Sequence, residues 1–296
     1  IEFDEVCKYY QMGDTTVKAA DHITMKIEKG EFVAIVGQSG SGKSTCMNII
    51  GCLDVPTEGT YLLDGRDVGK MSRRELAHIR NEKLGFIFQQ YNLLPKLTLL
   101  ENVEVPLVYA GIPAAQRHAT AKAALERVGL GNKLKNLPNQ LSGGQQQRIA
   151  LARALVISPD VLLMDEPLSN LDAKLRVEMR SVIRHTQKSV GITTVYVTHD
   201  QEEAMAISDR IAVMKDGVIQ HVGTPRDIYQ RPKNVFVATF IGRTNIVNAH
   251  VKDGIITFAD GYHEHIDALD KAAEQDVRCS IRPEEFIICK DGTDGP

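Results

Sequence analysis

The segment GQSGSGKST, from Gly37 to Thr45, is the part of the sequence that is most informative about the fold. It fits the pattern G-x-x-x-x-G-K-[ST], whose glycines let the backbone curl so that successive N–H groups point at phosphate oxygens. The apolar run FVAIV precedes it and the helical run TCMNII follows it, as the pattern requires. The sequence therefore predicts a phosphate-binding loop between a strand and a helix, whose N-terminus adds partial positive charge.

The pattern positions Gly37, Gly42, Lys43 and Ser44 have separate chemical roles in such a loop. Lys43 would neutralise the β- and γ-phosphates of a nucleotide, and the Ser44 hydroxyl would bind Mg²⁺. The alternative is an ordinary glycine-rich turn between a strand and a helix. Lysine and serine standing together in register argue against that alternative.

Two further apolar runs end in residues that can act on a phosphate. VLLMDE, from Val161 to Glu166, ends in two carboxylates, of which Asp165 can hold Mg²⁺ through water and Glu166 can polarise an attacking water. Alone, two acids after a strand would predict only the start of a solvated loop. TTVYVTH ends in His199, and ligands bind at the carboxyl ends of parallel strands. A lone histidine is otherwise more often structural.

Two other residues in these regions have weaker signals. Asp200 with Glu203 looks like a helix capping box, which gives the turn after His199 a structural reason to exist. Gln89 ends another short strand in FIFQQYNLLP, and by itself it predicts almost nothing.

Composition limits the class of protein. The 296 residues are 43% hydrophobic and carry a net charge of −3, which disfavours nucleic acid as a partner because phosphate neutralisation needs a basic face. We expect no membrane span, because no apolar run reaches eighteen residues, and no signal peptide. The cysteines are odd in number and lack a Cys-x-x-Cys pair, which favours a reducing cytosol over a disulfide framework or a zinc site. We expect each to be a small buried apolar residue: Cys7, Cys46, Cys52, Cys279 and Cys289.

Short β-branched runs alternate with helical patterns, which predicts an α/β fold with a parallel sheet. One helical pattern, AAQRHATAKAALERVGL, closes on Gly129. The texture changes around TPRDIYQRPKN, and NIVNAHVKDGIITFADGYHEHI then shows alternating runs broken by Asp-Gly pairs, a β-hairpin signal. We expect a domain boundary near residue 236, with domains of residues 1–235 and 236–296.

A second phosphate-binding helix start lies in LSGGQQQR, from Leu141 to Arg148. Ser142 offers a hydroxyl, Gly143 and Gly144 offer unobstructed N–H groups, and a helix starting near Gln145 would aim its positive end at a phosphate. This segment has no lysine, although the chain already has a complete phosphate loop. The sequence alone leaves open whose phosphate it holds.

Together these segments resemble the ATP-binding cassette family, the motor subunits of ABC transporters, over residues 1 to about 235. GQSGSGKST resembles its Walker A, LSGGQQQR its signature motif and VLLMDEP its Walker B. SNLD resembles the D-loop, His199 the H-loop histidine and Gln89 the Q-loop glutamine. Tyr10 stands where the family places the aromatic residue that stacks on adenine, with Tyr9 the weaker candidate.

The resemblance implies a P-loop cassette with a helical subdomain at about residues 90–150. It implies two cassettes packed head to tail, as a homodimer or with a second cassette, at the cytoplasmic face of the membrane against transmembrane permease subunits. LSGGQ of one chain would then close on the γ-phosphate bound by the other. The cofactors would be ATP and Mg²⁺.

The resemblance also implies a role for each matching residue. Catalysis would involve Glu166, His199 and Gln89, and Mg²⁺ would be held by Ser44, Gln89 and Asp165. Asp172 would couple the two sites at the dimer interface. The residues binding ATP would be Tyr10, Gly37, Ser39, Gly40, Ser41, Gly42, Lys43, Ser44 and Thr45, and those acting in trans would be Ser142, Gly143, Gly144 and Gln145.

The two halves of the chain resemble cassettes from systems that transport in opposite directions. The first half, with NIIGCLDVPTEGT and FIFQQYNLLP, resembles cassettes of lipoprotein-releasing and macrolide-exporting systems. The second half resembles importer cassettes for polyamines, sugars, sulfate or ferric iron, which work with an external solute-binding protein. Those carry a small C-terminal β-domain of the TOBE type, and NIVNAHV and SIRPEEFII resemble parts of it. We weigh this appended domain more heavily and predict an importer, whose all-β (TOBE/OB-like) domain is short or truncated.

Other functions remain as alternatives. Repair and chromosome ATPases of the same family insert long coiled coils, and no heptads occur here. Ribosome-associated members carry two cassettes in one chain, and a nucleotide kinase would leave LSGGQ unexplained. The leucine-rich segment YNLLPKLTLLENVEVPL has two interpretations, a groove that receives a permease helix or plain core packing of the helical subdomain. We favour the groove.

Overall fold

The computed structural model describes residues 1–285, and it divides into two compact units. The first runs from Ile1 to Pro225 and the second begins at Arg226. The division precedes residue 236, because the helices α8 (Pro225–Gln230) and α9 (Val235–Phe240) group with the C-terminal strands. Each unit is described by itself below.

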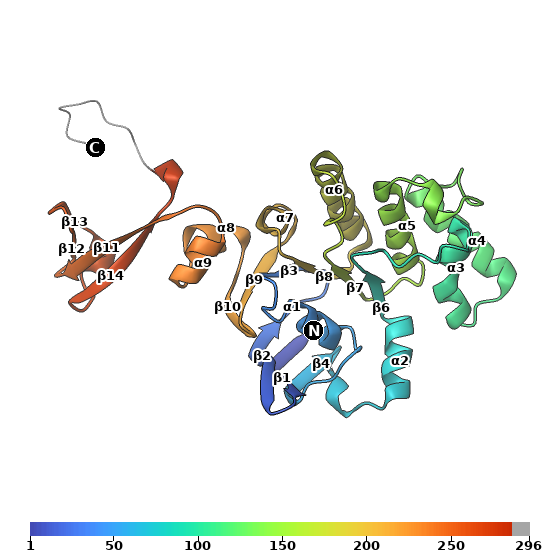
Figure 1. The fold of residues 1–296 in the computed structure, drawn as a ribbon, viewed down its shortest axis with the longest axis horizontal. Coiled ribbons are helices and arrows are strands. Elements are labelled where there is room, and N and C mark those ends of the chain that lie inside the picture. Colours follow the sequence, from blue (N-terminus) through green and yellow to red (C-terminus); the bar gives the residue numbers. More distant parts are fainter. Residues whose placement is uncertain (286–296) are drawn as a thin grey trace. The chain divides into compact units, whose positions relative to one another are not determined.

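A six-stranded sheet forms the centre of the first unit, in the order β10-β9-β3-β8-β7-β6 (Figure 1). All neighbours pair in parallel except β10 with β9. The predicted strands FVAIVG, VLLMDE and TTVYVTH are confirmed as neighbouring, almost wholly buried strands. The bounds are β3 (Phe32–Gly37), β6 (Leu84–Ile87), β7 (Val161–Asp165), β8 (Thr193–Thr198), β9 (Arg210–Lys215) and β10 (Val218–Gly223).

Alternate residues of these strands pack into two hydrophobic clusters, as the two-residue period of a strand requires. Leu163 and Val195 join a cluster that includes residues of α1 (Lys43–Ile50). Leu162 and Tyr196 join another, which includes residues of α6 (Ala173–Val190) and α7 (Gln201–Ile207). Both faces of the sheet are therefore covered, which explains why its strands are continuous apolar runs.

A second, antiparallel sheet was not predicted from the sequence. Its order is β2-β1-β4-β5, with β1 (Glu2–Met12), β2 (Thr15–Lys26), β4 (Glu58–Leu63) and β5 (Arg66–Asp67). The register of β1 with β2 shifts three times between Phe3 and Tyr9. These shifts interrupt the alternation of buried and exposed residues that would have revealed the strands. Helix α2 (Arg73–Glu82) follows this sheet and begins with a capping box at Ser72.

Helices α3 (Leu99–Tyr109), α4 (Ala114–Arg127) and α5 (Gly143–Leu155) form the helical part of the first unit (Figure 1). The α4 pattern is confirmed, and the helix stops just before Gly129, whose φ is 75°. Leu99, Leu100 and Leu107 are buried in a cluster shared by these helices. Core packing is therefore the correct interpretation of these three leucines, whereas Leu94 of the same segment is exposed, and the groove stays a prediction.

The second unit contains a four-stranded antiparallel sheet in the order β13-β12-β11-β14. The predicted hairpin is confirmed, because β11 (Asn245–Lys252) pairs with β12 (Ile255–Phe258) across Asp253 and Gly254, both at positive φ. The other strands are β13 (His263–His265) and β14 (Gln275–Ile281). The unit is not purely β, because α9 contacts β14. Short 3₁₀ turns in the chain span Val68–Lys70, Pro138–Gln140, Asp267–Leu269 and Pro283–Glu285.

Arg282 holds the second unit together from inside, with only 3% of its surface exposed. Its guanidinium lies 4.1 Å from the centre of the Tyr229 ring and donates to the carbonyl of Ala238 at 3.0 Å and that of Arg243 at 3.1 Å. A buried cation needs such acceptors, because it has lost its water. The arginine of the RPEE segment therefore has a structural role.

Cys7, Cys46 and Cys52 are buried as predicted, and Cys279 is only half-buried. Burial raises the pKa of the Cys46 thiol to about 12, which keeps it protonated and inert. Cys289 lies outside the described residues. Across residues 1–285, none of the helices combines the length and the apolarity needed to cross a membrane.

Candidate functional site

The phosphate loop lies between the end of β3 and the start of α1, as predicted. Gly40 and Gly42 have φ angles of 79° and 97°, which favour glycine. A Cβ atom on Gly42 would lie 2.1 Å from the carbonyl oxygen of Ala19, and one on Gly37 would lie 2.4 Å from that of Met214. Neighbouring strands therefore approach the loop so closely that only glycine fits at these two positions.

Lys43 and Ser41 give the loop the chemistry of an anion site. Lys43 is buried, and its Nζ donates to the carbonyls of Gly37 at 2.9 Å and Gln38 at 2.8 Å. Burial lowers the pKa of Lys43, whereas the charges of Glu166 and Asp165 raise it. The Ser41 hydroxyl is buried and has no hydrogen-bond partner among residues 1–285. A buried cation and an unpaired hydroxyl in a curled, glycine-rich loop fit a bound phosphate group.

The two carboxylates after β7 have different surroundings. Burial raises the pKa of Asp165, and the adjacent charge of Glu166 raises it further, while Lys43 lowers it. A nearby cation stabilises the ionised form of such a buried carboxylate. Mg²⁺ prefers oxygen ligands, which a carboxylate provides. The donor set of Asp165 and the exposed Ser44 hydroxyl at the start of α1 therefore fits Mg²⁺.

Glu166 is turned toward His199. Its backbone is left-handed, with φ 44°, and its N–H donates to the carbonyl of Val197 at 2.8 Å. One carboxylate oxygen lies 3.0 Å from Nδ1 of His199, so the structure brings these two predicted residues together. Both line a small cavity of about 40 Å³ that Ser169 and Thr198 also line. This volume is enough for a water molecule.

The turn after His199 differs from the predicted capping box. Asp200 does cap α7, because its Oδ1 accepts from the N–H of Glu203 at 3.1 Å. The Glu203 side chain does not return to the cap. It is buried and accepts from the hydroxyls of Tyr196 at 2.7 Å and Thr198 at 3.0 Å. Glu203 thus ties α7 to β8 and holds the strand end that carries His199.

Tyr10 reaches the phosphate loop and Tyr9 does not. The Tyr10 hydroxyl donates to Asp54 at 2.8 Å; burial and then Asp54 raise the pKa of Tyr10, and the side chain of Thr45, the last residue of the loop motif, acts against them. Lys8 lies 5.2 Å from the centre of the Tyr10 ring, which is 37% exposed. Tyr9 instead donates to Asp21 at 2.6 Å. This geometry favours Tyr10 as the residue available to a nucleotide base.

Gln89 is exposed two residues after β6. Its backbone carbonyl accepts from the side-chain amide of Asn170 at 2.9 Å. Asn170 belongs to the SNLD segment, so the two predicted loops are tethered to each other. Asp172, from the same segment, is the N-cap of α6 and accepts from the N–H of Leu175 at 2.9 Å.

The LSGGQ segment begins α5, which starts at Gly143 rather than near Gln145. Ser142 and Gln145 form a reciprocal capping box, with Ser142 Oγ accepting from the N–H of Gln145 at 3.4 Å. A Cβ atom on Gly144 would lie 2.8 Å from the Leu175 side chain. Gly144 is therefore needed for packing as well as for an open N–H. Among the hydrogen bonds of residues 1–285, none joins this segment to the phosphate loop of the same chain.

Three further residues, two of which hold parts of the site in place, were not predicted from the sequence. Asp54 holds both Tyr10 and Lys8. Arg153 of α5 donates to the carbonyls of Tyr91 and Asn92, each at 2.6 Å, and so fixes the chain that follows Gln89. Gln147 is completely buried, and in the part of the chain that the structure describes neither of its amide atoms has a hydrogen-bond partner. Of these, only Gln147, a glutamine on the buried face of a helix, carries a sequence signal.

Comparison with known proteins supports a common origin. The family model described as ABC transporter matches residues 20–169. The Fe(3+) ions import ATP-binding protein FbpC of Fusobacterium nucleatum is 46% identical over 294 residues, covering 99% of this chain and 76% of that protein. The macrolide export ATP-binding/permease protein MacB of Brucella abortus is 48% identical over 229 residues, covering 77% of this chain and 35% of that protein.

A solved structure has the same fold. It is a dimeric post-hydrolysis state of the ATP-binding cassette MJ0796 bound to ADP and Pi, with a TM-score of 0.69 and 41% identity. The aligned region covers 76% of this chain and 98% of the MJ0796 chain. The match in sequence, fold and loop geometry has one conclusion: the chain belongs to the ABC transporter family, as an ATP-binding cassette and hence an ATPase.

Proposed function

We propose that this chain is the ATP-hydrolysing motor subunit of a binding-protein-dependent ABC importer. The observation that carries the direction of transport is the extent of the matches. The import relative FbpC aligns with 99% of the chain, and so does the spermidine/putrescine import ATP-binding protein PotA of Thermobifida fusca at 42% identity. The export relative MacB aligns with 77%.

In this proposal the phosphate loop holds ATP. Lys43 neutralises the phosphates, and the backbone N–H groups from Ser39 to Thr45 surround them, with Gly37 and Ser41 completing the loop. Bound Mg²⁺ would offset the charge of the transferred phosphoryl group, with Ser44 and Asp165 as ligands and Gln89 beside them. Tyr10 stacks on the adenine. The unpaired Ser41 hydroxyl and the buried Lys43, whose pKa burial lowers, support this assignment.

Glu166 is the general base in the proposed mechanism. It accepts a proton from the water that attacks the γ-phosphate, and His199 holds the Glu166 carboxylate and contacts the same phosphate. The 3.0 Å contact between Glu166 and His199 and the water-sized cavity beside them support these roles. Gln89 orients the attacking water, and its tether to Asn170 connects that step to the SNLD loop.

The LSGGQ segment acts on the partner's nucleotide in a head-to-tail pair, formed with a second copy or another cassette. Ser142, Gly143, Gly144 and Gln145 lie at the start of α5, so their polar groups and the helix dipole can face a γ-phosphate. The absence of a lysine there is then explained, because the partner's phosphate loop supplies one. Asp172, exposed at the start of α6, couples the two sites.

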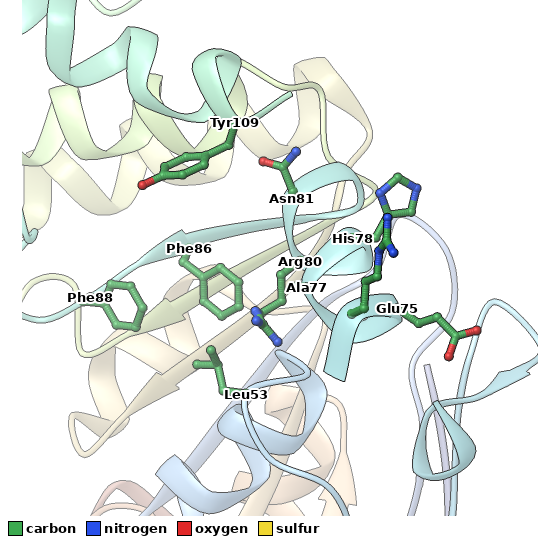
Figure 2. A pocket seen from close by; sticks show the side chains of 10 residues that line it. Leu53, Glu75, Ala77, His78, Arg80, Asn81, Phe86, Phe88 and Tyr109 are labelled. Atoms are coloured by element: carbon green, nitrogen blue, oxygen red, sulfur yellow. The ribbon is translucent and has the colours of Figure 1, made fainter. Parts of the chain in front are cut away.

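A hollow of about 910 Å³ in the first unit is the proposed docking surface for the permease subunits. Figure 2 shows the rings of Phe86, Phe88 and Tyr109 on one side of it and the side chains of α2 on the other. Apolar rings facing a charged helix suit an amphipathic permease helix. With permease subunits docked on this surface, the cassette would lie at the cytoplasmic face of the membrane.

We propose that the C-terminal unit contains a TOBE-like domain that begins near residue 236 and whose first strand is β11, from Asn245. Its antiparallel sheet and its buried Arg282 support an independent fold. The alternative function, a cassette of an exporter or lipoprotein-releasing system, is supported by the 48% identity with MacB. It leaves the C-terminal unit without a role.

Purification of the tagged chain from native membranes in mild detergent, with mass spectrometry of the partners, tests the proposal. Two multi-span permeases and a solute-binding protein are expected, and ATPase activity stimulated by those partners but not by DNA or RNA. The recovered binding protein can then be titrated with Fe³⁺ and with spermidine. A four-span permease with a large extracytoplasmic domain would overturn the importer and favour the exporter.

A further inference from the structure

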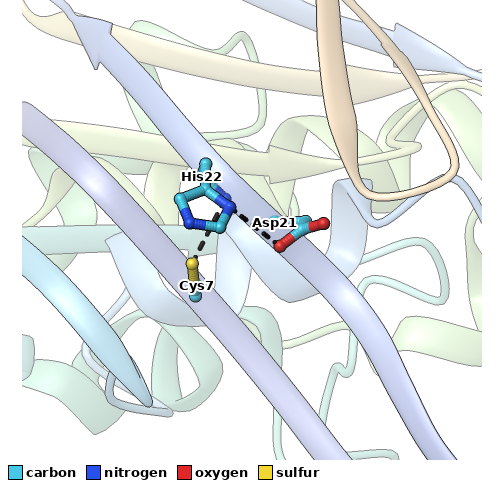
Figure 3. Close-up of side chains that lie close together, drawn as sticks. All are labelled: Cys7, Asp21 and His22. Carbon is cyan, nitrogen blue, oxygen red and sulfur yellow. Dashed lines mark hydrogen bonds and ion pairs between the residues drawn. The ribbon is translucent and has the colours of Figure 1, made fainter.

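Three side chains of the antiparallel sheet form a cluster that the nucleotide chemistry does not use. Cys7 lies on β1, and Asp21 and His22 lie on β2 (Figure 3). One potential ligand atom from each lies within 4.8 Å of the others. Neither sequence spacing nor a Cys-x-x-Cys pair signalled this cluster, because the fold brings together residues about fifteen positions apart.

The irregular pairing of β1 with β2 builds the cluster. In a regular strand, Asp21 and His22 would point to opposite faces of the sheet. The register shifts and the left-handed backbone of His22, with φ 51°, bring their side chains together, so that His22 Nδ1 lies 3.0 Å from Asp21 Oδ1. Strained backbone of this kind concentrates at functional sites.

Each of the three groups is held in position by a neighbour. Cys7 is 1% exposed, and its sulfur accepts from the backbone N–H of His22 at 3.2 Å. Asp21 accepts from the Tyr9 hydroxyl at 2.6 Å, which fixes the carboxylate as outer partners fix metal ligands. The hydrogen bonds of Tyr9 and then Lys18 lower the pKa of Asp21, so it is ionised at neutral pH. The His22 side chain is 60% exposed, so water has access to the cluster.

We propose that Cys7, Asp21 and His22 bind one divalent cation of the Zn²⁺ class, with a water molecule as the fourth ligand. A thiolate, an imidazole and a carboxylate form a donor set that suits tetrahedral Zn²⁺, whereas Mg²⁺ and Ca²⁺ prefer oxygen alone. On binding, the sulfur–metal bond forms as the Cys7 thiol loses its proton to solvent. Neutral His22 donates a ring nitrogen lone pair, and Asp21 binds as the anion.

One cation already competes for this position. Lys18 Nζ lies 3.2 Å from Asp21 Oδ2. The Lys18 side chain is 55% exposed and can move into solvent, so a bound metal displaces it at small cost. Replacing Lys18 therefore strengthens metal binding, a result that a purely structural role of the cluster does not predict.

The cluster is connected to the nucleotide site by backbone. The N–H of Asp21 donates to the carbonyl of Gly217 at 2.9 Å, and the N–H of Gly217 donates to the carbonyl of Ser41 at 3.1 Å. The metal must therefore be measured without nucleotide and with a probe specific for sulfur. This separates it from Mg²⁺ in the phosphate loop and from the proposed transport function.

Cobalt titration of the reduced, metal-free, nucleotide-free full chain under anaerobic conditions tests the site. We expect one Co²⁺ per chain, with a sulfur-to-cobalt charge-transfer band, strong visible absorption of a tetrahedral ion, and displacement by Zn²⁺. C7S should abolish the charge-transfer band, and H22N should weaken binding at least roughly tenfold. K18Q should bind Co²⁺ more tightly than the wild type.

The controls are C279S and H118Q, which remove another accessible sulfur and another exposed histidine beside a carboxylate. Both should keep the wild-type spectrum. If C7S does not fold, H22N still decides, because position 22 is exposed and asparagine tolerates left-handed backbone. Absence of a charge-transfer band in the wild type, or an unchanged affinity in H22N, overturns the proposal.

Discussion

At the scale of single residues, the proposed chemistry depends on two adjacent carboxylates in unlike surroundings. Asp165 is held beside Lys43 and has a raised pKa, whereas Glu166 turns away to contact His199. The separation occurs where β7 ends, at the positive φ of Glu166 (44°). One acid can therefore serve a cation while its neighbour serves a water.

Replacing Glu166 with glutamine tests the general base. Glu166→Gln keeps size and hydrogen bonding but cannot accept a proton at neutral pH, so ATP turnover should fall by about 10²–10⁴-fold. ATP affinity, measured by calorimetry, should remain, and an ATP-bound dimer should accumulate in gel filtration. Lys43→Ala serves as the contrast and should lose affinity itself. Turnover near the wild-type rate in Glu166→Gln would remove the residue from its proposed role.

Ionisation of the buried Asp165 lowers the free energy of unfolding of the nucleotide-free protein. Its pKa is raised mainly by burial, so the folded state binds this proton more strongly than the unfolded state. Its contribution to stability is therefore greatest at low pH and declines as pH rises from the unfolded value through the raised folded value. At neutral pH the ionised group destabilises the nucleotide-free protein.

Asp165→Asn should accordingly raise the thermal unfolding midpoint of the nucleotide-free protein at neutral pH while greatly lowering Mg²⁺-dependent turnover. The difference in midpoint should shrink as pH falls toward the range in which Asp165 is protonated. Differential scanning calorimetry at several pH values measures this. A lower midpoint for the variant at neutral pH would show that Asp165 is not strained by burial.

At the scale of elements, sequence and structure agree where one interaction dominates. The three strands that end at Gly37, Asp165 and Thr198 are rich in apolar and β-branched residues because both sheet faces are covered, so they were predicted. The antiparallel sheet escaped prediction because its register shifts erase the alternation. The Glu203 capping box was wrong because two buried hydroxyls compete successfully for the carboxylate.

The site residues were predictable for a different reason. Gly37, Gly42 and Gly144 appear in motifs because a Cβ atom at each position would be too close to a neighbour. A steric constraint of this kind is visible in the sequence as a glycine at a fixed position of a motif. Asp54 and Arg153 act through contacts that depend on tertiary structure, so no local pattern could identify them.

The packing of Gly144 against Leu175 gives a prediction at the level of helices α5 and α6. In Gly144→Ala the new methyl group would lie 2.8 Å from the Leu175 side chain, and the overpacking should cost roughly 1–3 kcal/mol of unfolding free energy. Adding Leu175→Ala should relieve part of that cost. Denaturant unfolding of both single variants and the double variant gives the coupling energy. Additive effects would mean that these two residues do not oppose each other.

At the scale of the whole molecule, the proposed function requires the cassette to pass a change at its nucleotide to a membrane partner. The hollow lined by Phe86, Phe88 and Tyr109 lies beside the segment that leads to Gln89. Arg153 fixes the chain after Gln89 to α5, the helix that begins at LSGGQ. The proposed docking surface, the nucleotide and the signature segment thus share a continuous set of elements.

Tyr109 is the residue with which to test that surface, because its side chain borders the hollow and 78% of the residue is exposed. Removing the ring in Tyr109→Ala takes apolar contact from a docked helix without opening a cavity in the core, so the unfolding midpoint should stay close to that of the wild type. Recovery of permease subunits with the tagged chain should fall at least roughly tenfold, the effect of a lost aromatic anchor of about 1.4 kcal/mol or more. Tyr262→Ala, an exposed tyrosine of the C-terminal unit, is the matched control. Equal recovery of permease with both variants would mean that the membrane partner binds elsewhere on the cassette.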